Sequence, residues 1–500
     1  MTTQTTAAAR ARRKDEIRAI LSQEFTMLVG GRSVGAADGS TFVTADPYTG
    51  EALTSVPDAT PQDVDAAVQA AEGARSSWRE TPVVERARYV LALADVIETH
   101  TEELALLDTL DVGSPITNAR NDVRIAVEQM RMYAGLALEL KGQTIPASDA
   151  LHLTVREPVG VVAKIFPFNH PLMFACRVAA PLIAGNPCVI KPPEAGPLST
   201  LRLGALARDV LPAGVLNVIV GDGPAVPDRL VRHPAVRRIG FIGSENTGRA
   251  IQRAAAETGV KEVSLELGGK NAMIVFDDVR VDEAAASAVA GMNFMWAGQS
   301  CGSTSRLLVQ DAIYDKVLEE VRRQVERIQV GDPLEESTTQ GTMVDARAQA
   351  KALGYIKAGL EDGARLVCGG GIPDTGRSAA TFVSPTVLAD VEPGSRVAQE
   401  EIFGPVLSVI RFRDEQEAVE IANSVRYGLT GSVWTNDLDR AFRVAGSMEA
   451  GFTWINGSTA HFPNVPYGGV KASGAGAKEE CLEELLSYTS EKVINVMIRR

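Results

Sequence analysis

The chain has 500 residues, of which 45% are hydrophobic and 23% charged, so it is long enough for two or more domains with large cores. Its formal net charge of −13 disfavours nucleic acid and anionic membrane surfaces as partners. No apolar run approaches the roughly 20 residues that a membrane-spanning helix needs, which leaves a soluble globular protein as the expectation.

The N-terminal segment MTTQTTAAARARRK is basic, but it lacks the apolar core of a secretion signal. We expect a flexible tail over residues 1–20, with an organelle presequence as the alternative. The five cysteines are widely spaced and form no C-x-x-C pair, which disfavours disulfides and structural zinc. Because the histidines also lack H-x-x-x-H spacing, we predict no metal site, and reduced thiols in the cytoplasm.

Two amphipathic helices are predicted early in the chain. Thr60, Pro61 and Asp63 form a start that resembles a capping box, and apolar residues then recur at helical spacing. The stretch RARYVLALADVIETH keeps this period, and its helix is expected to stop near Gly113. Both helices are expected to cover a sheet.

From residue 159 the pattern changes to short apolar runs: VGVVAKIF, PCVIK, VLNVIV, RRIGFIG, EVSLEL and NAMIVF. Helical stretches at 171–184, 198–210 and 246–258 separate several of them. Alternating strands and helices predict a parallel sheet covered on both faces. A second series, including SRLLVQ, VLSVIRF and GSVWTN, predicts a second α/β domain.

Two segments of the first series carry groups that suit a nucleotide. Gly243 and Ser244 end a strand and open a helix, whose free N–H groups favour phosphate. Lys191 and Glu194 follow another strand, where a lysine and a carboxylate can hold ribose hydroxyls. The carboxylate would repel a 2′-phosphate, which favours NAD over NADP. Taken alone, a structural turn and a solvent-exposed ion pair explain these segments as well.

Three side chains suggest acyl chemistry. Cys301 lies among small residues in GQSCGSTS, Asn169 directly follows a strand, and Glu266 ends one. A thiolate can attack a carbonyl, a neutral amide can donate to an oxyanion, and a carboxylate can act as a base. Each residue alone is equally compatible with a structural role, the cysteine as a small buried hydrophobe.

Nine segments together resemble the NAD(P)-dependent aldehyde dehydrogenase superfamily in order and spacing. They are FPFNHP, KPPE, GFIGSENTG, LELGGKNAMIVFDD, GQSCGSTSR, EEIFGPV, YGLTGSVWTND, GFTWIN and PYGGVKASGAG. The resemblance runs from about residue 25 to the C-terminus. It implies that Cys301 is the nucleophile, Glu266 the general base and Asn169 the oxyanion donor. Arg177 stands where the family usually has a lysine beside the active site.

The resemblance also implies an NAD site. Lys191 and Glu194 would bind the adenosine ribose, Gly243 and Ser244 the pyrophosphate, and Glu401 and Phe403 the nicotinamide ribose. The cofactor-binding residues would also include Phe166 and Pro167. Lys471 matches the lysine of the late glycine-rich motif. The implied reaction is NAD-dependent oxidation of a small aldehyde to its acid, through a thiohemiacetal and a thioester on Cys301 that Glu266-activated water hydrolyses. The alternatives are a CoA-acylating semialdehyde dehydrogenase, which needs no base for water, and a non-catalytic protein of the same fold.

The sequence departs from the family at positions that would line the substrate funnel. His170 and His461 stand where aromatic residues are common, and Phe174 and Tyr467 complete the predicted substrate residues. We expect a funnel more polar than in relatives that take long apolar aldehydes, unless the two histidines only replace aromatic rings in packing. Three other departures remove no reacting group: Pro193, Phe168 and Ile242.

The resemblance implies an α/β fold in two domains. A Rossmann-like domain with a five-stranded open sheet would bind NAD (residues 21–138 and 158–268), and a second α/β domain (269–485) would be catalytic. Residues 139–157 and 486–500 look like strands of a small β element with exposed edges, and similar segments in the family pair across subunits. We therefore expect a homodimer or homotetramer.

Overall fold

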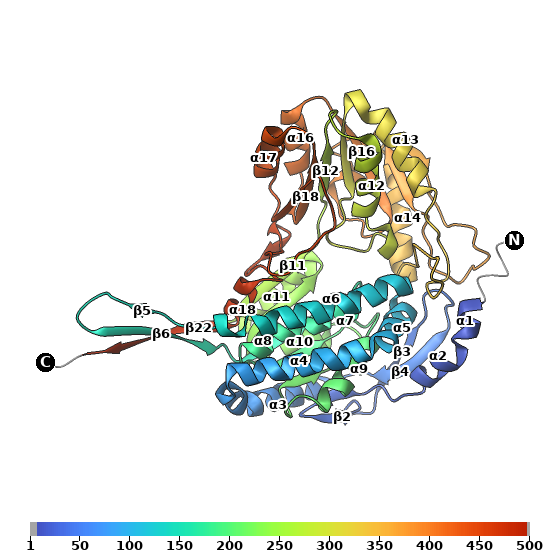
Figure 1. Ribbon diagram of the computed structural model, residues 1–500. Coiled ribbons are helices and arrows are strands. Elements are labelled where there is room, and N and C mark those ends of the chain that lie inside the picture. The colour runs from blue at the N-terminus through green and yellow to red at the C-terminus, as the bar shows by residue number, and fades with distance from the viewer. Residues whose placement is uncertain (1–7, 498–500) are drawn as a thin grey trace.

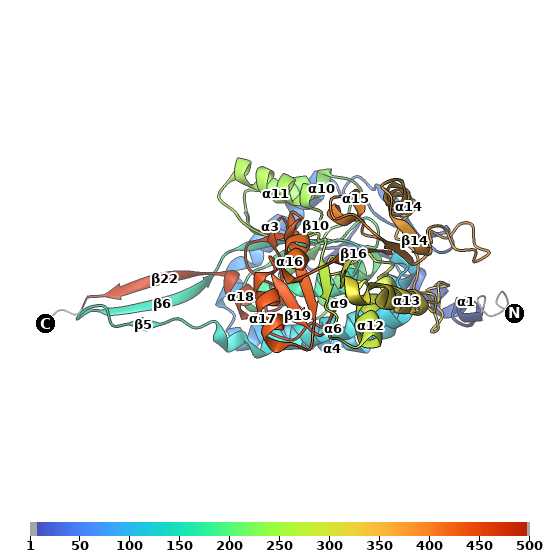
Figure 2. The same ribbon diagram turned by 90° about the horizontal axis from the view of Figure 1, so that it is seen from above.

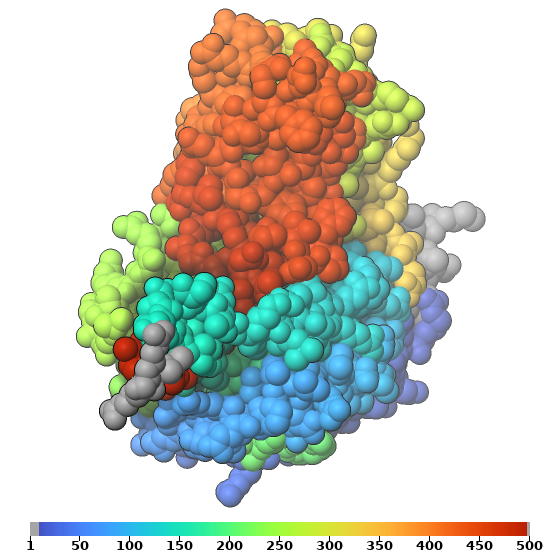
Figure 3. All heavy atoms as spheres, turned by 60° about the vertical axis from the view of Figure 1, so that its left-hand side comes forward, coloured from blue at the N-terminus to red at the C-terminus, as the bar shows by residue number. Residues whose placement is uncertain are grey.

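The computed structural model describes residues 8–497, with the side chains of Ala8 and Ala9 left out. Two lobes lie one above the other (Figure 1), and a narrow arm projects to one side (Figures 1 and 2). In Figure 3 the first part of the chain, in blue to cyan, forms the lower part of the face, and orange-red C-terminal segments lie above it. No helix within residues 8–497 is long and apolar enough to cross a membrane.

The lower lobe contains an eight-stranded sheet in the order β2-β1-β9-β8-β7-β10-β11-β21. Its central five strands, β9 to β11 in that order, are parallel, as predicted from the apolar runs. The sequence prediction missed β1 and β2 at one edge and β21 at the other. The strands are β1 (Met27–Val29), β2 (Arg32–Val34), β7 (Val161–Ile165), β8 (Cys188–Lys191), β9 (Leu216–Val218), β10 (Val236–Gly243), β11 (Glu262–Leu267) and β21 (Gly474–Ala475).

The strand order creates a switch point in this sheet. The chain runs from β7 outward to β8 and β9, and then returns to the other side of β7 with β10 and β11. Connections therefore leave β7 and β10 in opposite directions, which opens a crevice at the carboxyl ends of these strands. Asn169 follows β7 and Ser244 follows β10, so two predicted site residues lie at this edge.

Helices cover both faces of the sheet. Helix α3 begins with the predicted capping box: Thr60 and Asp63 bond reciprocally through side chain and backbone. The single helix expected to reach Gly113 is instead two helices, because the backbone leaves the helical conformation at His100. The helices are α3 (Pro61–Glu80), α4 (Val83–Thr99), α5 (Thr101–Val112), α6 (Ile116–Gly135), α7 (Pro171–Ala175), α8 (Ala179–Ile183), α9 (Leu198–Arg208), α10 (Ala225–Arg232) and α11 (Glu245–Thr258).

The upper lobe contains a seven-stranded sheet in the order β14-β15-β16-β13-β12-β18-β19, parallel except for β14. With the first sheet it confirms the predicted α/β class. The strands are β12 (Ala272–Val275), β13 (Arg306–Gln310), β14 (Arg365–Cys368), β15 (Thr386–Ala389), β16 (Val406–Phe412), β18 (Thr430–Trp434) and β19 (Phe452–Ile455). The helices of this lobe are α12 (Val281–Gly291), α13 (Tyr314–Val325), α14 (Ala346–Glu361), α15 (Arg396–Gln399), α16 (Glu415–Asn423) and α17 (Leu438–Ser447).

The projecting arm is a three-stranded antiparallel sheet in the order β22-β6-β5 (Figure 1). It joins β5 (Thr144–Ile145) and β6 (Leu151–Pro158) to β22 (Thr489–Val496), which follows the short helix α18 (Leu482–Ser487). The two segments predicted to form a small β element therefore lie side by side. Two antiparallel two-stranded sheets complete the strands: β3 (Thr41–Ala45) with β4 (Ala52–Pro57), and β17 (Tyr427–Gly428) with β20 (Val470–Lys471).

The N-terminal segment differs from the flexible tail expected over residues 1–20. Residues 1–7 lie outside the described residues, but α1 (Ala8–Arg12) and α2 (Lys14–Leu21) are helical, and Ile20 is buried. Arg10 pairs with Asp46 at 2.6 Å and with Asp332 at 2.9 Å, and its guanidinium lies 4.7 Å from the Tyr48 ring centroid. Because Asp332 belongs to the upper lobe, this contact ties the N-terminal helix to both lobes.

We expect Arg10→Ala to destabilise the protein by about 2–4 kcal/mol, because it leaves the buried carboxylates of Asp46 and Asp332 without their cation. The measurement is the midpoint of thermal unfolding, which should fall by several degrees. Arg12→Ala is the matched control on the same helix, since this side chain is 68% exposed and lies 3.5 Å from Glu335. Equal midpoints for the two variants would contradict the role of Arg10.

Candidate active site

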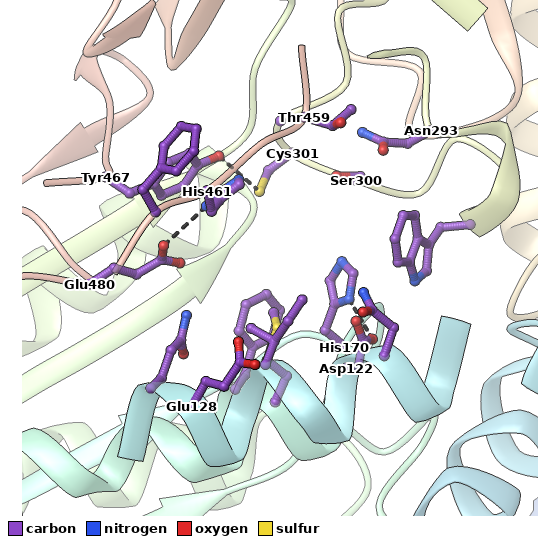
Figure 4. Close-up of a pocket in the computed structure, with 18 of the residues that line it drawn as sticks. Asp122, Glu128, His170, Asn293, Ser300, Cys301, Thr459, His461, Tyr467 and Glu480 are labelled. Carbon is purple, nitrogen blue, oxygen red and sulfur yellow. Dashed lines mark hydrogen bonds and ion pairs between the residues drawn. The ribbon is translucent and has the colours of Figure 1, made fainter. Parts of the chain in front are cut away.

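A cavity of about 520 Å³ lies between the lobes. Its walls come from α6, from the segment after β7, from the segment around Cys301 and from the loop after β19. Seven of the predicted site residues line it: Cys301, Glu266, Arg177, His170, Phe174, His461 and Tyr467. Figure 4 shows Cys301 and His461 on one side of this space and His170 on the other.

The Cys301 segment is held by the side chain of Asn271. Its Nδ2 donates to the carbonyl oxygens of Cys301 at 2.8 Å and Ser303 at 2.9 Å, while its Oδ1 accepts from the Thr430 amide at 3.0 Å. Gly298 precedes the cysteine at φ +67°, and a Cβ there would lie 2.2 Å from the Gly404 carbonyl oxygen. A glycine is therefore required for this loop to reach its position.

The carboxylate of Glu266 is buried beside the cysteine. Glu266 lies in β11 opposite Ile242 of β10 and Gly474 of β21, and its Oε1 has no hydrogen-bond partner in the described chain. Burial, with the neighbouring charge of Glu479, raises the pKa of Glu266 to about 8. Burial also raises the pKa of Cys301, and the Glu266 charge raises it further. Without a ligand, the thiol form of Cys301 is favoured.

The two glycines after Glu266 make room for another carboxylate. The backbone N–H of Gly269 donates to Glu401 Oε1 at 3.0 Å, and a Cβ on Gly268 would lie 2.2 Å from Glu401 Oε2. Phe403 adopts φ +56°, and its ring packs edge-on against Phe168 with centroids 5.9 Å apart. Of the predicted nicotinamide-ribose residues, Glu401 therefore lies beside the end of the strand that carries Glu266, and Phe403 packs against Phe168 in the loop after β7.

Asn169 is buried in the loop after β7, and its side-chain amide forms no hydrogen bond within residues 8–497. It is not among the residues that line the cavity, although its neighbour His170 is. The backbone N–H of Cys301 also lacks a partner in this part of the chain. The Asn169 amide and the Cys301 backbone N–H are therefore two hydrogen-bond donors without a partner in the described chain.

Arg177 forms a buried ion-pair cluster instead of standing free. Its guanidinium pairs with Glu479, lies 2.6 Å from Glu480, and lies 4.9 Å from the Phe174 ring centroid. Burial opposes its charge, but the carboxylates raise the pKa of Arg177 above its ordinary value. The arginine therefore stays charged and neutralises acidic side chains at the cavity wall.

The predicted substrate residues form two groups. His170 Nδ1 lies 2.7 Å from Asp122 Oδ2, while His461 Nδ1 lies 3.0 Å from Glu480 Oε2 (Figure 4). The rings of His461 and Tyr467 are 4.5 Å apart, and the Tyr467 hydroxyl lies 4.0 Å from Cys301 Sγ. Both histidines thus have a carboxylate partner, and their rings also pack against aromatic side chains.

The remaining cofactor candidates lie away from this cavity, at the edge of the first sheet. Lys191 Nζ lies 3.1 Å from Glu194 Oε2, and Ser244 caps helix α11 after Gly243. Phe166 and Pro167 follow the end of β7. Lys471 lies elsewhere: its Nζ donates to the carbonyl oxygens of Asn423 and Val425 after helix α16.

Four residues at the site were not predicted from the sequence: Asn271, Asp122, Glu479 and Glu480. Asn271 alone had a sequence signal, because it directly follows LELGGK. Asp122 lies on an amphipathic helix, and nothing in its sequence pattern marks this residue. Glu479 and Glu480 are about 300 residues away from Arg177 in the chain, so their pairing leaves no sequence signal.

Known proteins resemble this chain over nearly its whole length. The model of the aldehyde dehydrogenase family matches residues 34–494. Aldehyde dehydrogenase tropH of Talaromyces stipitatus is 45% identical over 91% of this chain and 89% of its own length, and phenylacetaldehyde dehydrogenase of Pseudomonas fluorescens is 41% identical over 93% and 94%. The NAD⁺ complex structure of aldehyde dehydrogenase from Bacillus cereus superimposes with a TM-score of 0.93 at 38% identity, covering 97% of this chain and 99% of that one.

The chain therefore belongs to the aldehyde dehydrogenase family, as the nine sequence segments predicted. It is an oxidoreductase, and its general reaction is the oxidation of aldehydes.

Proposed function

We propose that this enzyme oxidises a small aldehyde to the carboxylic acid with NAD, through a thiohemiacetal and then a thioester on Cys301. The observation that carries the proposal is that Cys301 and the buried carboxylate of Glu266, whose Oε1 has no hydrogen-bond partner within residues 8–497, line the same cavity. A nucleophile and a base in one enclosed space are what acyl transfer to water requires.

The residues at the edge of the first sheet fit NAD. The Lys191–Glu194 pair offers a donor and an acceptor to a ribose diol, and the N-terminus of α11 offers free N–H groups to a pyrophosphate. Glu401, beside Gly268 and Gly269, would hold the second ribose. When bound, NAD would accept the hydrogen and two electrons that the aldehyde loses. The Glu194 carboxylate would disfavour a 2′-phosphate, as in NADP.

Each protein group has a separate task in the proposed reaction. Cys301 Sγ bonds to the aldehyde carbon once its proton has left, and the oxygen that becomes negative accepts from Asn169 and from the Cys301 backbone N–H. After oxidation, Glu266 removes a proton from water as the water attacks the thioester carbon. The C–S bond then breaks, which releases the acid and returns the thiol.

The decisive experiment supplies the purified enzyme with aldehyde and NAD, NADP or NAD with CoA, and identifies the product. We expect free acid, with NADH formed in equal amount, and faster turnover with NAD than with NADP. Acyl-CoA as the main product would establish the CoA-acylating alternative. If no aldehyde reduces NAD, the result would favour the alternative of a non-catalytic protein with this fold.

We expect Asn169→Ala to lower kcat about 100-fold, because it removes one donor from the oxyanion. The protein should remain folded, since Asn169 makes no hydrogen bond that the fold needs. Steady-state NADH formation, compared with the thermal unfolding midpoint, checks both statements. Near-normal turnover of a folded variant would refute the role of Asn169.

We also propose that the arm mediates assembly into a homodimer or homotetramer in the cytoplasm. Among residues 8–497, strand β22 has a partner on one edge only, and Val493, Ile494 and Val496 are exposed on this strand. All five cysteines are free, which fits a reducing compartment. Sedimentation of the whole protein tests the assembly; a monomer at micromolar concentration would contradict it.

A further inference from the structure

His170 is fixed in one orientation at the cavity wall. Its Nδ1 lies 2.7 Å from the buried carboxylate of Asp122 on helix α6. Its ring packs edge-on against Phe174 at 5.4 Å and lies 5.1 Å from the Trp296 ring. A carboxylate only accepts hydrogen bonds, so Nδ1 is the donor in this pair. The other nitrogen, Nε2, has no partner within residues 8–497 and is the atom left for a ligand.

A hydroxyl is the group that best complements this free nitrogen. With Nδ1 protonated, Nε2 accepts a hydrogen bond when the ring is neutral and donates one when the ring is charged. An ether or carbonyl oxygen can serve only the charged ring, and an ammonium group only the neutral ring. A hydroxyl both donates and accepts, so it matches His170 in either state.

The rest of the cavity favours a flat substrate without charge. Aromatic side chains form much of the wall: Phe174, Trp296, Trp454, Phe462 and Tyr467. The two arginines of the lining are already paired, Arg124 with Glu128 at 2.5 Å and Arg177 with Glu480 at 2.6 Å. Arg177 is held in its buried acidic cluster, whereas the Arg124–Glu128 pair is exposed and weak. The acidic residues of the lining would repel a substrate carboxylate.

We propose that the enzyme prefers neutral aryl aldehydes that carry a ring hydroxyl, and that His170 Nε2 recognises this hydroxyl. The inference rests on the proposed function, since the aldehyde carbon must reach Cys301. Figure 4 places His170 across the cavity from Cys301, so the ring of the substrate would lie between them. Asp122 acts only as a positioning residue, because it holds the histidine and not the substrate.

The first test compares kcat/KM for benzaldehyde with its hydroxy and methoxy derivatives, each substituent placed in turn at the meta and para positions. The pH is kept where the phenol is neutral. For the wild type, we expect the best hydroxy isomer to exceed both benzaldehyde and its methoxy analogue about fivefold to tenfold, the effect of one hydrogen bond. In His170→Phe, which keeps an aromatic ring, this ratio should fall to about one.

His461→Phe is the matched control, because His461 lines the same cavity and also has a carboxylate partner at Nδ1. The hydroxyl preference should persist in this variant. If His461→Phe loses the hydroxyl preference and His170→Phe keeps it, the hydroxyl binds at the opposite wall of the cavity. This result would overturn the proposal. Equal kcat/KM for hydroxy and unsubstituted aldehydes in the wild type would overturn it as well.

The second test measures binding without chemistry. Calorimetric titration of Cys301→Ala with 4-hydroxybenzaldehyde, 3-hydroxybenzaldehyde and benzaldehyde should show tighter binding of one hydroxy compound, and His170→Phe in this background should remove the difference. If no aldehyde is oxidised but the binding preference persists, the proposed function fails and His170 recognition stands. If aldehydes are oxidised but bind and react without preference, only the present proposal fails.

Discussion

Replacing Cys301 by alanine should abolish aldehyde-dependent NADH formation, with a loss of at least about a thousandfold in kcat. Cys301 is the one cysteine that lines the cavity, and the hydroxyls of the lining, such as those of Ser300 and Tyr467, are much weaker nucleophiles than a thiolate. Without a covalent bond to the aldehyde carbon, the oxyanion that drives the oxidation does not form. Initial rates of NADH formation at saturating NAD measure the loss.

Cys368→Ala provides the matched control for this variant. Cys368 is a half-buried thiol in β14 and lies at the edge of the second sheet, away from the cavity. Its removal should leave the rate unchanged. Residual turnover of Cys301→Ala above about a tenth of the wild-type rate would exclude a covalent role for Cys301.

Glu266→Gln should separate the two halves of the reaction. We expect one rapid equivalent of NADH per subunit, followed by steady-state turnover about a thousandfold slower, because the thioester lacks a base to activate water. Rapid mixing with a single aldehyde resolves the burst. Glu262→Gln, at the exposed start of the same strand, should show wild-type turnover.

The pH dependence of hydrolysis follows from the burial of Glu266. Only the ionised carboxylate can take a proton from water, and burial raises its pKa to about 8. Steady-state turnover should therefore rise as the pH increases through about 8 when hydrolysis limits the rate. A flat profile between pH 6 and 9 would contradict Glu266 as the base, whereas loss of the rise in Glu266→Gln would support it.

The sequence allowed prediction of what depends on local pattern. Thr60 and Asp63 lie three residues apart, so their capping box could be recognised directly, and the parallel strands of the first sheet followed from continuous apolar runs. The cavity could be predicted only through the family resemblance, because Glu266 and Cys301, each taken alone, are equally compatible with a structural role. In the structure both residues line one cavity, and their roles as base and nucleophile stay predictions.

Pairings between distant charges could not be predicted. Arg10 meets Asp332 across 322 residues, and His170 meets Asp122 across 48. Any of the 63 acidic residues could have been the partner of Arg10 or His170, since long-range pairing leaves no periodic signal in the chain. The same reason explains why the sequence predicts a tail where the structure has the N-terminal helices. Arg10 has no partner nearby in the chain, and its carboxylate partners Asp46 and Asp332 come together only in the fold.

The route of the chain also bears on its synthesis. The first sheet ends at β21 (Gly474–Ala475), which pairs with Glu266 and its neighbour Leu265, and the arm needs β22 (Thr489–Val496). The lower lobe contains the first strands to be synthesised, but its sheet is complete only after almost all 500 residues have left the ribosome. Until then the edges of β11 and β6 stay open to non-native strand pairing, so nascent chains are exposed to aggregation through the edge that carries the proposed base.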